Sequence, residues 1–219
     1  MLNAWMLLTL LVTVGAQELP KGQFPEGWVV RPDGAAGHAT HGAPPAAAPD
    51  VKDLVFVTMK PGWHITTGPT VILYQPAQKA SGTYTLKSDI FLFDPGTRQE
   101  AFGVLLGGRN LERDDQSYTY FVIRRSGEFL VRRRTGATTV DIKAWTAHAA
   151  IKKFEDKAAD KSSVLNVLEV KVAPDTTTFI VNGAEVTRVA TRDIDTDGTV
   201  GLRISHQLNL HVSALDVIR

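Results

Sequence analysis

The sequence of 219 residues contains no cysteine. Disulfides, thiolate metal sites and a lipid-modified cysteine are therefore excluded, so a domain of this size must be stabilised by its apolar core. An excess of charge is lacking as well, because 24 Lys and Arg residues balance 23 Asp and Glu residues to a net charge of +1. This balance gives no general attraction to nucleic acid or to anionic lipid, and no nucleic-acid partner is expected.

An apolar run long enough to span a membrane is also missing. The run Ala4–Val14 has the length of the hydrophobic region of a signal peptide, and small residues precede Gln17. We therefore predict a signal peptide over residues 1–16, cleaved before Gln17, with no membrane span afterwards. The stretch before the run lacks Lys and Arg, which leaves an uncleaved anchor as the alternative. Together with the absence of cysteine, the signal favours a bacterial secreted or periplasmic protein.

Residues 17–50 are rich in Gly, Pro and Ala, which predicts a flexible arm or linker, because such a stretch buries little apolar surface. Its apolar residues between Phe24 and Val30 could instead dock on the main domain as a first strand. His38 and His41 have a spacing that suits a metal site only on a helix, and the surrounding Gly and Pro argue against a helix. Two solvated linker histidines are the simpler interpretation.

Residues 51–219 show short alternating runs separated by turn signals. The alternation in Tyr84–Phe93 places Tyr84, Leu86, Ile90 and Leu92 on one face of a strand. Ser126-Gly127 and Asn182-Gly183 predict tight hairpin turns. Residues 145–163 break the pattern and predict one short helix or a long loop. We therefore predict a single all-β domain, a two-sheet antiparallel β-sandwich of jelly-roll type.

Three segments carry a resemblance to a known superfamily. Asn166–Val170 followed by Thr178–Val186 resembles the paired strands of concanavalin A-like lectins and glucanases, which include laminin-G-like domains. The tail Gly198–His206 is similar to a strand of the 3-keto-disaccharide hydrolase family of secreted bacterial proteins. The resemblance covers about residues 51–219 and implies the sandwich fold. Folds host many functions, so it implies activity only weakly.

The chain departs from these families in three places. Arg203 stands where the hydrolase family usually has Gln, and the stretch from His211 to Ala214 replaces an aromatic–Arg–Asn run. The superfamily's glucanases carry E-x-D-x-x-E on one strand, and no predicted strand here has E-x-D. A retaining glycosidase needs two carboxyl groups about 5 Å apart, so glucanase activity of that kind is not expected.

The stretch Gly201–Val212 supplies the first candidate site. Its Leu and Ile residues belong to the core by alternation, and the polar residues between them should form one surface across a hairpin. This places Arg203, Asn209 and His211 together, with His206 at the bend. If the protein is an enzyme, His206 or His211 with Asp89 would be the acid and base.

Further candidates lie in turns and a hairpin. Trp63 and His64 suit a sugar-stacking platform with a hydrogen-bonding neighbour, or a core Trp at the sandwich edge. Arg125 and Arg132 could hold an acidic sugar, although alternation divides the five arginines of this hairpin between two faces. The shared strand face of Tyr118 and Tyr120, and His148 after Trp145, fit a ligand-lined concavity and core packing equally well.

A metal loop is the last candidate. Asp193, Asp195 and Asp197 precede Gly198 with the spacing that opens a calcium loop. The closing Glu of an EF-hand would fall at Ile204, so that full motif is absent. Calcium at this loop and a plain Asp-Gly turn are the two alternatives. No other cofactor is expected.

These observations leave three functions open. The first is a secreted module that binds a carbohydrate or glycan without glucanase catalysis. The second is a hydrolase-like enzyme acting on (3-keto-)disaccharides, as the resemblance implies. The third is a structural or protein-interaction domain of the cell envelope.

Overall fold

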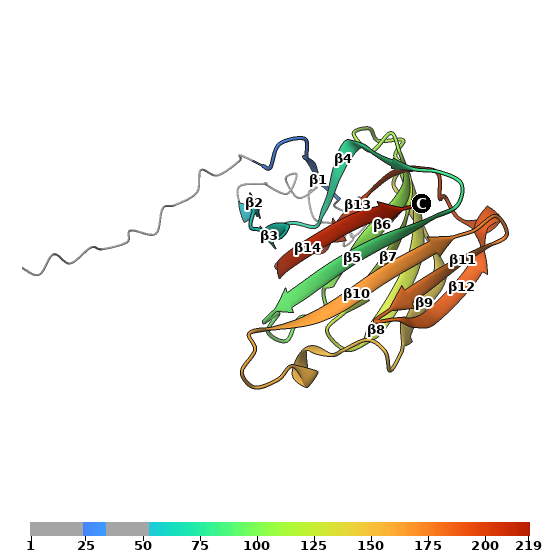
Figure 1. Cartoon of the computed structure of the whole chain (residues 1–219). Coiled ribbons are helices and arrows are strands. Elements are labelled where there is room, and N and C mark those ends of the chain that lie inside the picture. Colours follow the sequence, from blue (N-terminus) through green and yellow to red (C-terminus); the bar gives the residue numbers. More distant parts are fainter. Residues whose placement is uncertain (1–23, 34–52) are drawn as a thin grey trace, which may run out of the picture.

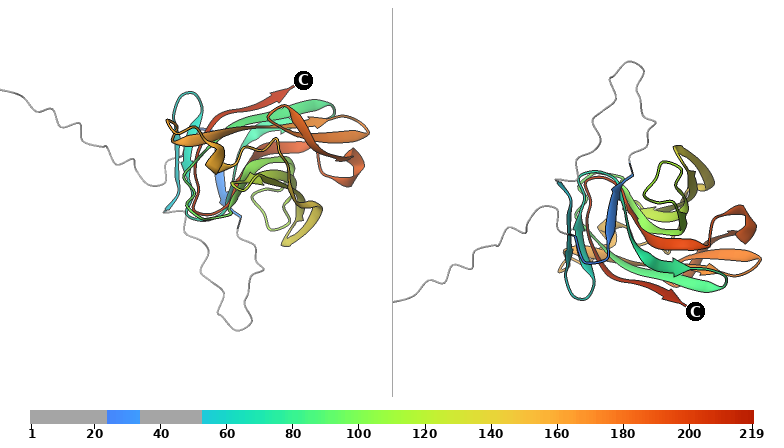
Figure 2. Two further views of the ribbon diagram at one scale, coloured as in Figure 1. Left: turned by 90° about the horizontal axis from the view of Figure 1, so that it is seen from below. Right: turned by 90° about the horizontal axis from the view of Figure 1, so that it is seen from above.

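A computed structural model of the chain describes residues 24–33 and 53–219. The predicted signal peptide and the histidines at 38 and 41 lie outside these residues. The described part forms two seven-stranded sheets packed face to face (Figures 1 and 2), which confirms the predicted jelly-roll sandwich. It contains no helix long and apolar enough to cross a membrane.

The first sheet, sheet A, has the strand order β1-β4-β13-β6-β7-β8-β9. Its strands are β1 (Val29–Pro32), β4 (Val71–Ala80), β13 (Gly198–Ile204), β6 (Ala101–Arg109), β7 (Ser117–Arg124), β8 (Glu128–Thr135) and β9 (Thr138–Ala147). Strand β1 pairs with β4, and Trp28 just before it is buried in the core. The alternative that residues near Val30 dock as a first strand is therefore confirmed.

The second sheet, sheet B, has the order β12-β11-β10-β5-β14-β3-β2. Its strands are β12 (Ala184–Ala190), β11 (Thr176–Val181), β10 (Ser163–Val172), β5 (Tyr84–Phe93), β14 (Asn209–Ile218), β3 (Trp63–Thr66) and β2 (Val55–Thr58). Strands β14, β5 and β10 lie side by side in the front layer of Figure 1. All pairs within both sheets are antiparallel, as hairpin-rich sandwiches require.

The core lies between the sheets and is made by the alternation read from the sequence. In β5 the buried residues alternate strictly with half-buried ones, so Tyr84, Leu86, Ile90 and Leu92 point inward as predicted. Both predicted hairpin turns are present. Asn182 and Gly183 have φ of 52° and 83°, the positive values that a type I′ turn needs. Ser126-Gly127 joins β7 to β8.

The segment 145–163 forms no α-helix. Strand β9 runs to Ala147, and the rest is a loop with one 3-10 turn, η2 (Phe154–Asp156). Ile151 and Phe154 are buried in the core, which explains their apolar spacing without a helix. Of the two sequence interpretations, the long loop is the one observed.

Two asparagines fix this loop to sheet B. Asn166 accepts a hydrogen bond from the backbone N–H of Lys152 at 2.9 Å and donates one to its carbonyl at 3.0 Å. Asn182 donates to the carbonyl of Ala150 and to Asn166, both at 2.8 Å, and accepts from the N–H of Val167. The turn residue therefore also holds the loop in place.

The substitution Asn182→Gly should lower the free energy of unfolding by about 1–3 kcal/mol, because three partly buried partners lose their hydrogen bonds while Gly still accepts the positive φ. Urea denaturation measures the change. Asn110→Gly is the matched control, since Asn110 also has positive φ but makes only an exposed side-chain bond to Asp115. Equal effects of the two substitutions would contradict this role of Asn182.

Candidate functional site

Sheet A buries side chains on both of its faces. One face belongs to the core between the sheets. The other face carries a second cluster of buried residues: Ile72, Tyr74, Ala101, Leu105, Leu111, Tyr118, Tyr120, Val122 and Leu130. Trp145 of β9 packs against this cluster. A sheet face that only meets solvent would not bury such large residues, so this outer face is the candidate functional surface.

A pocket of about 210 Å³ opens on this face, and we call it the sheet A pocket. Its lining comes from β6, β7, β8, β9 and β13 and from residues that flank them: Gln99, Glu100, Ala101, Tyr120, Val122, Arg124, Leu130, Arg132, Trp145, Arg203 and Ser205. The register explains the convergence. Gly103 of β6 lies opposite both Arg203 and Val122, and Val122 lies opposite Leu130. Four neighbouring strands therefore bring one row of residues together.

Guanidinium groups lie against the aromatic rings of the pocket. The Cζ atom of Arg203 is 4.4 Å from the ring centroid of Tyr120. The Cζ atom of Arg124 is 4.4 Å from the ring of Trp145. At these distances the cation and the ring attract each other, which holds both side chains in position. One face of each ring is covered by positive charge.

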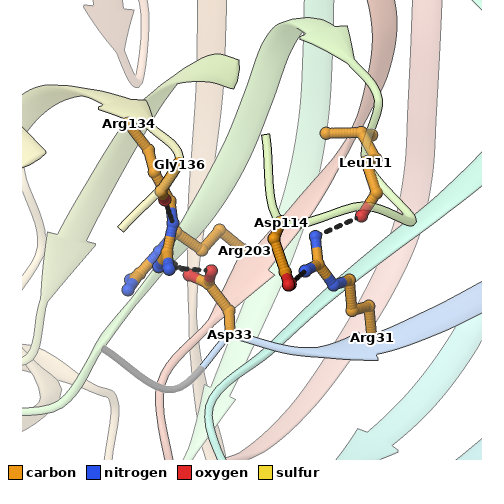
Figure 3. Close-up of polar contacts among 7 residues, drawn as sticks. All are labelled: Arg31, Asp33, Leu111, Asp114, Arg134, Gly136 and Arg203. Atoms are coloured by element: carbon orange, nitrogen blue, oxygen red, sulfur yellow. Dashed lines mark hydrogen bonds and ion pairs between the residues drawn. The ribbon is translucent and has the colours of Figure 1, made fainter. Parts of the chain in front are cut away.

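Asp33, just after β1, lies between Arg203 and Arg134 and binds both (Figure 3). Its Oδ2 accepts from Nε of Arg203 at 2.9 Å, and its Oδ1 accepts from Nη1 of Arg134 at 2.7 Å. The Asp33 side chain is fully buried, and the two arginine side chains are 15% and 7% exposed. Burial, the largest single influence, lowers the pKa of Arg203, but the interactions with Asp33, Tyr120 and Tyr118 together outweigh it, and the pKa is raised. Arg203 therefore stays charged.

Tyr118 stands beside this network. Burial raises the pKa of its hydroxyl, and the nearby charge of Asp33 raises it further. The phenol is therefore neutral at any physiological pH.

Figure 3 also shows Arg31, which donates to the carbonyl of Leu111 and lies 3.6 Å from Asp114.

The other charged groups of the pocket are paired at its rim. Nη2 of Arg124 lies 2.6 Å from Glu128, whose pKa is lowered chiefly by the hydrogen bond from Arg124. Arg132 pairs with Asp141 on β9. Glu100, the one carboxylate in the pocket lining, lies 3.1 Å from Nε2 of His206.

The sequence prediction that one hairpin face joins Arg203 with Asn209 and His211 is wrong. Strand β13 belongs to sheet A and β14 to sheet B, so the chain crosses the sandwich at residues 205–208. Arg203 lines the sheet A pocket, whereas His211 lies on sheet B opposite His64. The proposed acid–base set is divided as well, because His206 stands at the pocket rim while Asp89 pairs with Ala214 in sheet B.

The outer face of sheet B carries two neighbouring histidines, His64 and His211, apart from the sheet A pocket. His64 packs against Phe93 with ring centroids 5.7 Å apart, and His211 packs against Phe91 at 5.9 Å. Burial lowers the pKa of His64, and the neighbouring His211 lowers it further. Neither His64 nor His211 lines the sheet A pocket.

Stability should fall as the pH drops below the ordinary histidine pKa of 6.5, because the unfolded chain then binds a proton at His64 that the folded chain still excludes. The loss continues until the pH reaches the lowered folded-state pKa. NMR titration should give a midpoint for His64 below 6.5, and His211→Ala should raise it. A His64 midpoint at or above 6.5 in the intact protein would contradict the burial argument.

The remaining predicted residues lie apart from one another. Trp63 packs on Trp28 with ring centroids 4.9 Å apart and serves the core, in agreement with the simpler interpretation. Arg125 lies in the β7–β8 turn and pairs with Glu155. Only Arg132 and Arg203 of the predicted ligand-binding residues line the sheet A pocket.

The three aspartates before Gly198 do not form a cluster. Asp197 accepts from the N–H of Gly82 at 3.1 Å, and Asp193 lies 3.8 Å from Arg192. The backbone N–H of Asp195 donates to Thr119. Within residues 24–33 and 53–219, no three or more His, Asp or Glu side chains are placed to hold a metal ion.

Sequence reasoning named Arg132, Arg203 and Tyr120 separately but missed Arg124 and the convergence of these side chains in one pocket. Arg124, Arg132 and Arg134 share the outer face of sheet A, because residues two apart on one strand point the same way and β7 pairs with β8. The alternation of Tyr118, Tyr120 and Arg124 was the signal available. Asp33 gave no signal, since its partners are 101 and 170 residues away.

Comparisons with known proteins identify the fold. No protein-family model and no curated protein matches the chain. It is similar in structure to a carbohydrate binding module, CBM66, from Bacillus subtilis (10% identity, 88% of this chain and 96% of the other covered, TM-score 0.60). It is similar to a galectin-like protein of unknown function from Bacillus subtilis (10%, 87% and 88%, 0.59). A family 16 endo-glucanase from Bacteroides ovatus also matches (8%, 90% and 97%, 0.58).

At these identities the likeness shows the fold alone, and the fold is the jelly-roll β-sandwich that the sequence predicted. The narrower resemblance to 3-keto-disaccharide hydrolases is not confirmed.

Proposed function

We propose that the protein binds a carbohydrate in the sheet A pocket. The observation that carries this proposal is the combination of hydrogen-bond donors and aromatic rings in one recess. Guanidinium groups of Arg124, Arg132 and Arg203 stand beside Tyr120 and Trp145. Sugars present hydroxyl groups at their edges and C–H faces, which such a surface can hold by hydrogen bonds and ring contacts. The likeness to a carbohydrate binding module and to a glucanase supports the proposal.

Binding is favoured over hydrolysis by the carboxylates. Glycoside hydrolysis of the usual kind needs two carboxyl groups that flank one bond, one of them with a raised pKa. Glu100 is the one carboxylate in the lining of this pocket. Glu128 at the rim has a lowered pKa, which is the opposite of what a general acid needs. A glycan-binding module is therefore proposed, and turnover of plain or 3-keto disaccharides would overturn it.

The sequence supports a location outside the cytoplasm for this activity. The predicted signal peptide and the absence of cysteine support an exported protein that meets glycans outside the cytoplasm. A role as an envelope interaction domain predicts instead that no sugar binds at the pocket.

A glycan array, followed by calorimetry on any sugar it identifies, tests the proposal. Trp145→Ala should weaken binding by about tenfold, because Trp145 forms one wall of the pocket and holds Arg124. His211→Ala is the matched control, since His211 is an aromatic residue on the outer face of the other sheet. Binding lost in His211→Ala but kept in Trp145→Ala would overturn the assignment of the site.

A further inference from the structure

We infer that the sugar unit held in the sheet A pocket is acidic, and that its carboxylate or sulfate group is bound by Arg132 and Arg203. This inference rests on the proposed function and names the ligand class of the same site. Three features of the pocket support it: the unused donors of these arginines, the positive charge that covers the aromatic rings, and the balance of charge in the lining.

Each arginine keeps donors that its internal partner does not use. Arg203 donates to Asp33 through Nε, and Arg132 donates to Asp141 through Nε. Within the described residues, no terminal nitrogen of either guanidinium donates a hydrogen bond to a carboxylate. A guanidinium has five N–H groups, and its free edge matches the paired oxygens of a carboxylate or sulfate. Both groups line the pocket. Arg132 also bonds Tyr120 and Arg203 also bonds Tyr118, and the remaining N–H groups of each guanidinium are left for a ligand.

The covered rings make simple stacking less suitable as the main attraction. Arg203 lies over Tyr120 and Arg124 over Trp145, each at 4.4 Å. A ligand that approaches these covered ring faces meets a guanidinium first. Such a surface recognises negative charge more strongly than the neutral face of a sugar ring.

The lining carries an excess of positive charge. Three arginines stand in the lining against one carboxylate, Glu100, and each arginine also has a carboxylate partner outside the lining: Glu128 for Arg124, Asp141 for Arg132 and Asp33 for Arg203. The fully buried Asp33 carboxylate partly neutralises Arg203. An anion in this partly enclosed space interacts more strongly than it would in bulk water. The pocket of about 210 Å³ is below the roughly 300–1,000 Å³ of sites for drug-sized ligands, which suits one sugar unit.

Calorimetry with three matched disaccharides tests the inference. They end in glucuronic acid, in glucose 6-sulfate and in glucose. We expect at least one acidic disaccharide to bind about tenfold more tightly than the neutral one, with an affinity that falls as salt is added. The two acidic probes distinguish a carboxylate from a sulfate as the recognised group. Equal or tighter binding of the neutral disaccharide would overturn the inference while leaving the proposed function intact.

Two variants test which charged residues of the pocket determine the binding of acidic sugars. Arg132→Gln should weaken acidic-sugar binding about tenfold, and Glu100→Gln should strengthen it about threefold by removing the repelling carboxylate. The Arg132 side chain is 29% exposed and its ion-pair partner Asp141 is 41% exposed, so its loss should leave the fold intact. Arg188→Gln is the matched control, because it removes an equal charge from an exposed pair with Glu185 on sheet B. If none of the three disaccharides binds and the glycan array is also empty, the proposed function fails with it. If Arg188→Gln weakens acidic-sugar binding as much as Arg132→Gln does, the preference for acidic sugars comes from the protein's overall charge and not from the pocket. That result would overturn the inference.

Discussion

Replacing Asp33 with alanine should destabilise the folded protein by about 3–5 kcal/mol, because two buried guanidinium groups lose their shared carboxylate. Asp33 has no exposed side-chain surface, so water cannot take over its role. Arg134 and Arg203 would be left as uncompensated charges at 7% and 15% exposure. Urea denaturation at neutral pH measures the loss. The matched control is Glu185→Ala, whose solvent-exposed pair with Arg188 should contribute much less to stability.

A double-mutant cycle separates the ion pair from other effects of the substitution. In the background of Arg134→Met, where one of the two cations is already gone, Asp33→Ala should cost clearly less than in the natural chain. Additive effects would show that the Asp33–Arg134 contact carries no coupling energy. Asp33→Ala should also weaken sugar binding in whatever fraction stays folded, because Arg203 loses the carboxylate that orients it toward the pocket.

Much of the fold could be predicted because alternating apolar residues and turn dipeptides mark the strands locally in the sequence. The alternation of β5 fixes its inward residues, and Asn182-Gly183 fixes a hairpin through positive φ alone. These signals need only neighbouring residues. The loop 148–162 was harder, since Ile151 and Phe154 reach the core from an irregular backbone whose apolar spacing looks the same as that of a helix.

The site depends on which sheet each strand joins and on contacts between distant residues, and no local sequence pattern predicts either. Alternation shows that Arg203 and His211 each face away from the core, but it does not say which sheet each strand joins. A hairpin and a crossover between sheets have the same alternating signature, and residues 205–208 form the crossover. The Asp33 network is a second case. It joins β1, β8 and β13 through contacts that follow from topology, and only the assembled sheet reveals them.

The outer face of sheet A shows a third limit of sequence reasoning. Tyr118 and Tyr120 are as buried as core residues, although they point away from the core. In a half-solvated sheet, alternation separates core residues from polar ones. In β7 both faces are apolar or aromatic, and the burial pattern is continuous over Tyr118–Ile123. The pocket therefore lies where this alternation fails, over β7 and its neighbour β6, which are both buried on two faces.

Replacing Gly62 with alanine should lower the free energy of unfolding by roughly 2–5 kcal/mol, from left-handed backbone strain and a steric clash together. Gly62 precedes β3 and has a φ of 89°, a region that residues with a side chain rarely adopt. A Cβ there would overlap the carbonyl oxygen of Val212 and lie 2.7 Å from Cα of Ser213. Both are backbone atoms of β14, and moving them would disturb the pairing of β3 with β14. Thermal or urea denaturation measures the change.

Gly82 supplies the control that isolates the clash. It lies between β4 and β5 with a φ of 68°, close to that of Gly62, yet a Cβ there would meet no atom within 4 Å. Gly82→Ala should therefore cost only the backbone strain, about 1–2 kcal/mol. The difference between the two alanine variants gives the steric contribution of the close approach to β14. If both lose the same stability, β14 yields to a methyl group at no cost, and the tight packing of the β2–β3 turn on sheet B has no part in holding that edge of the sandwich.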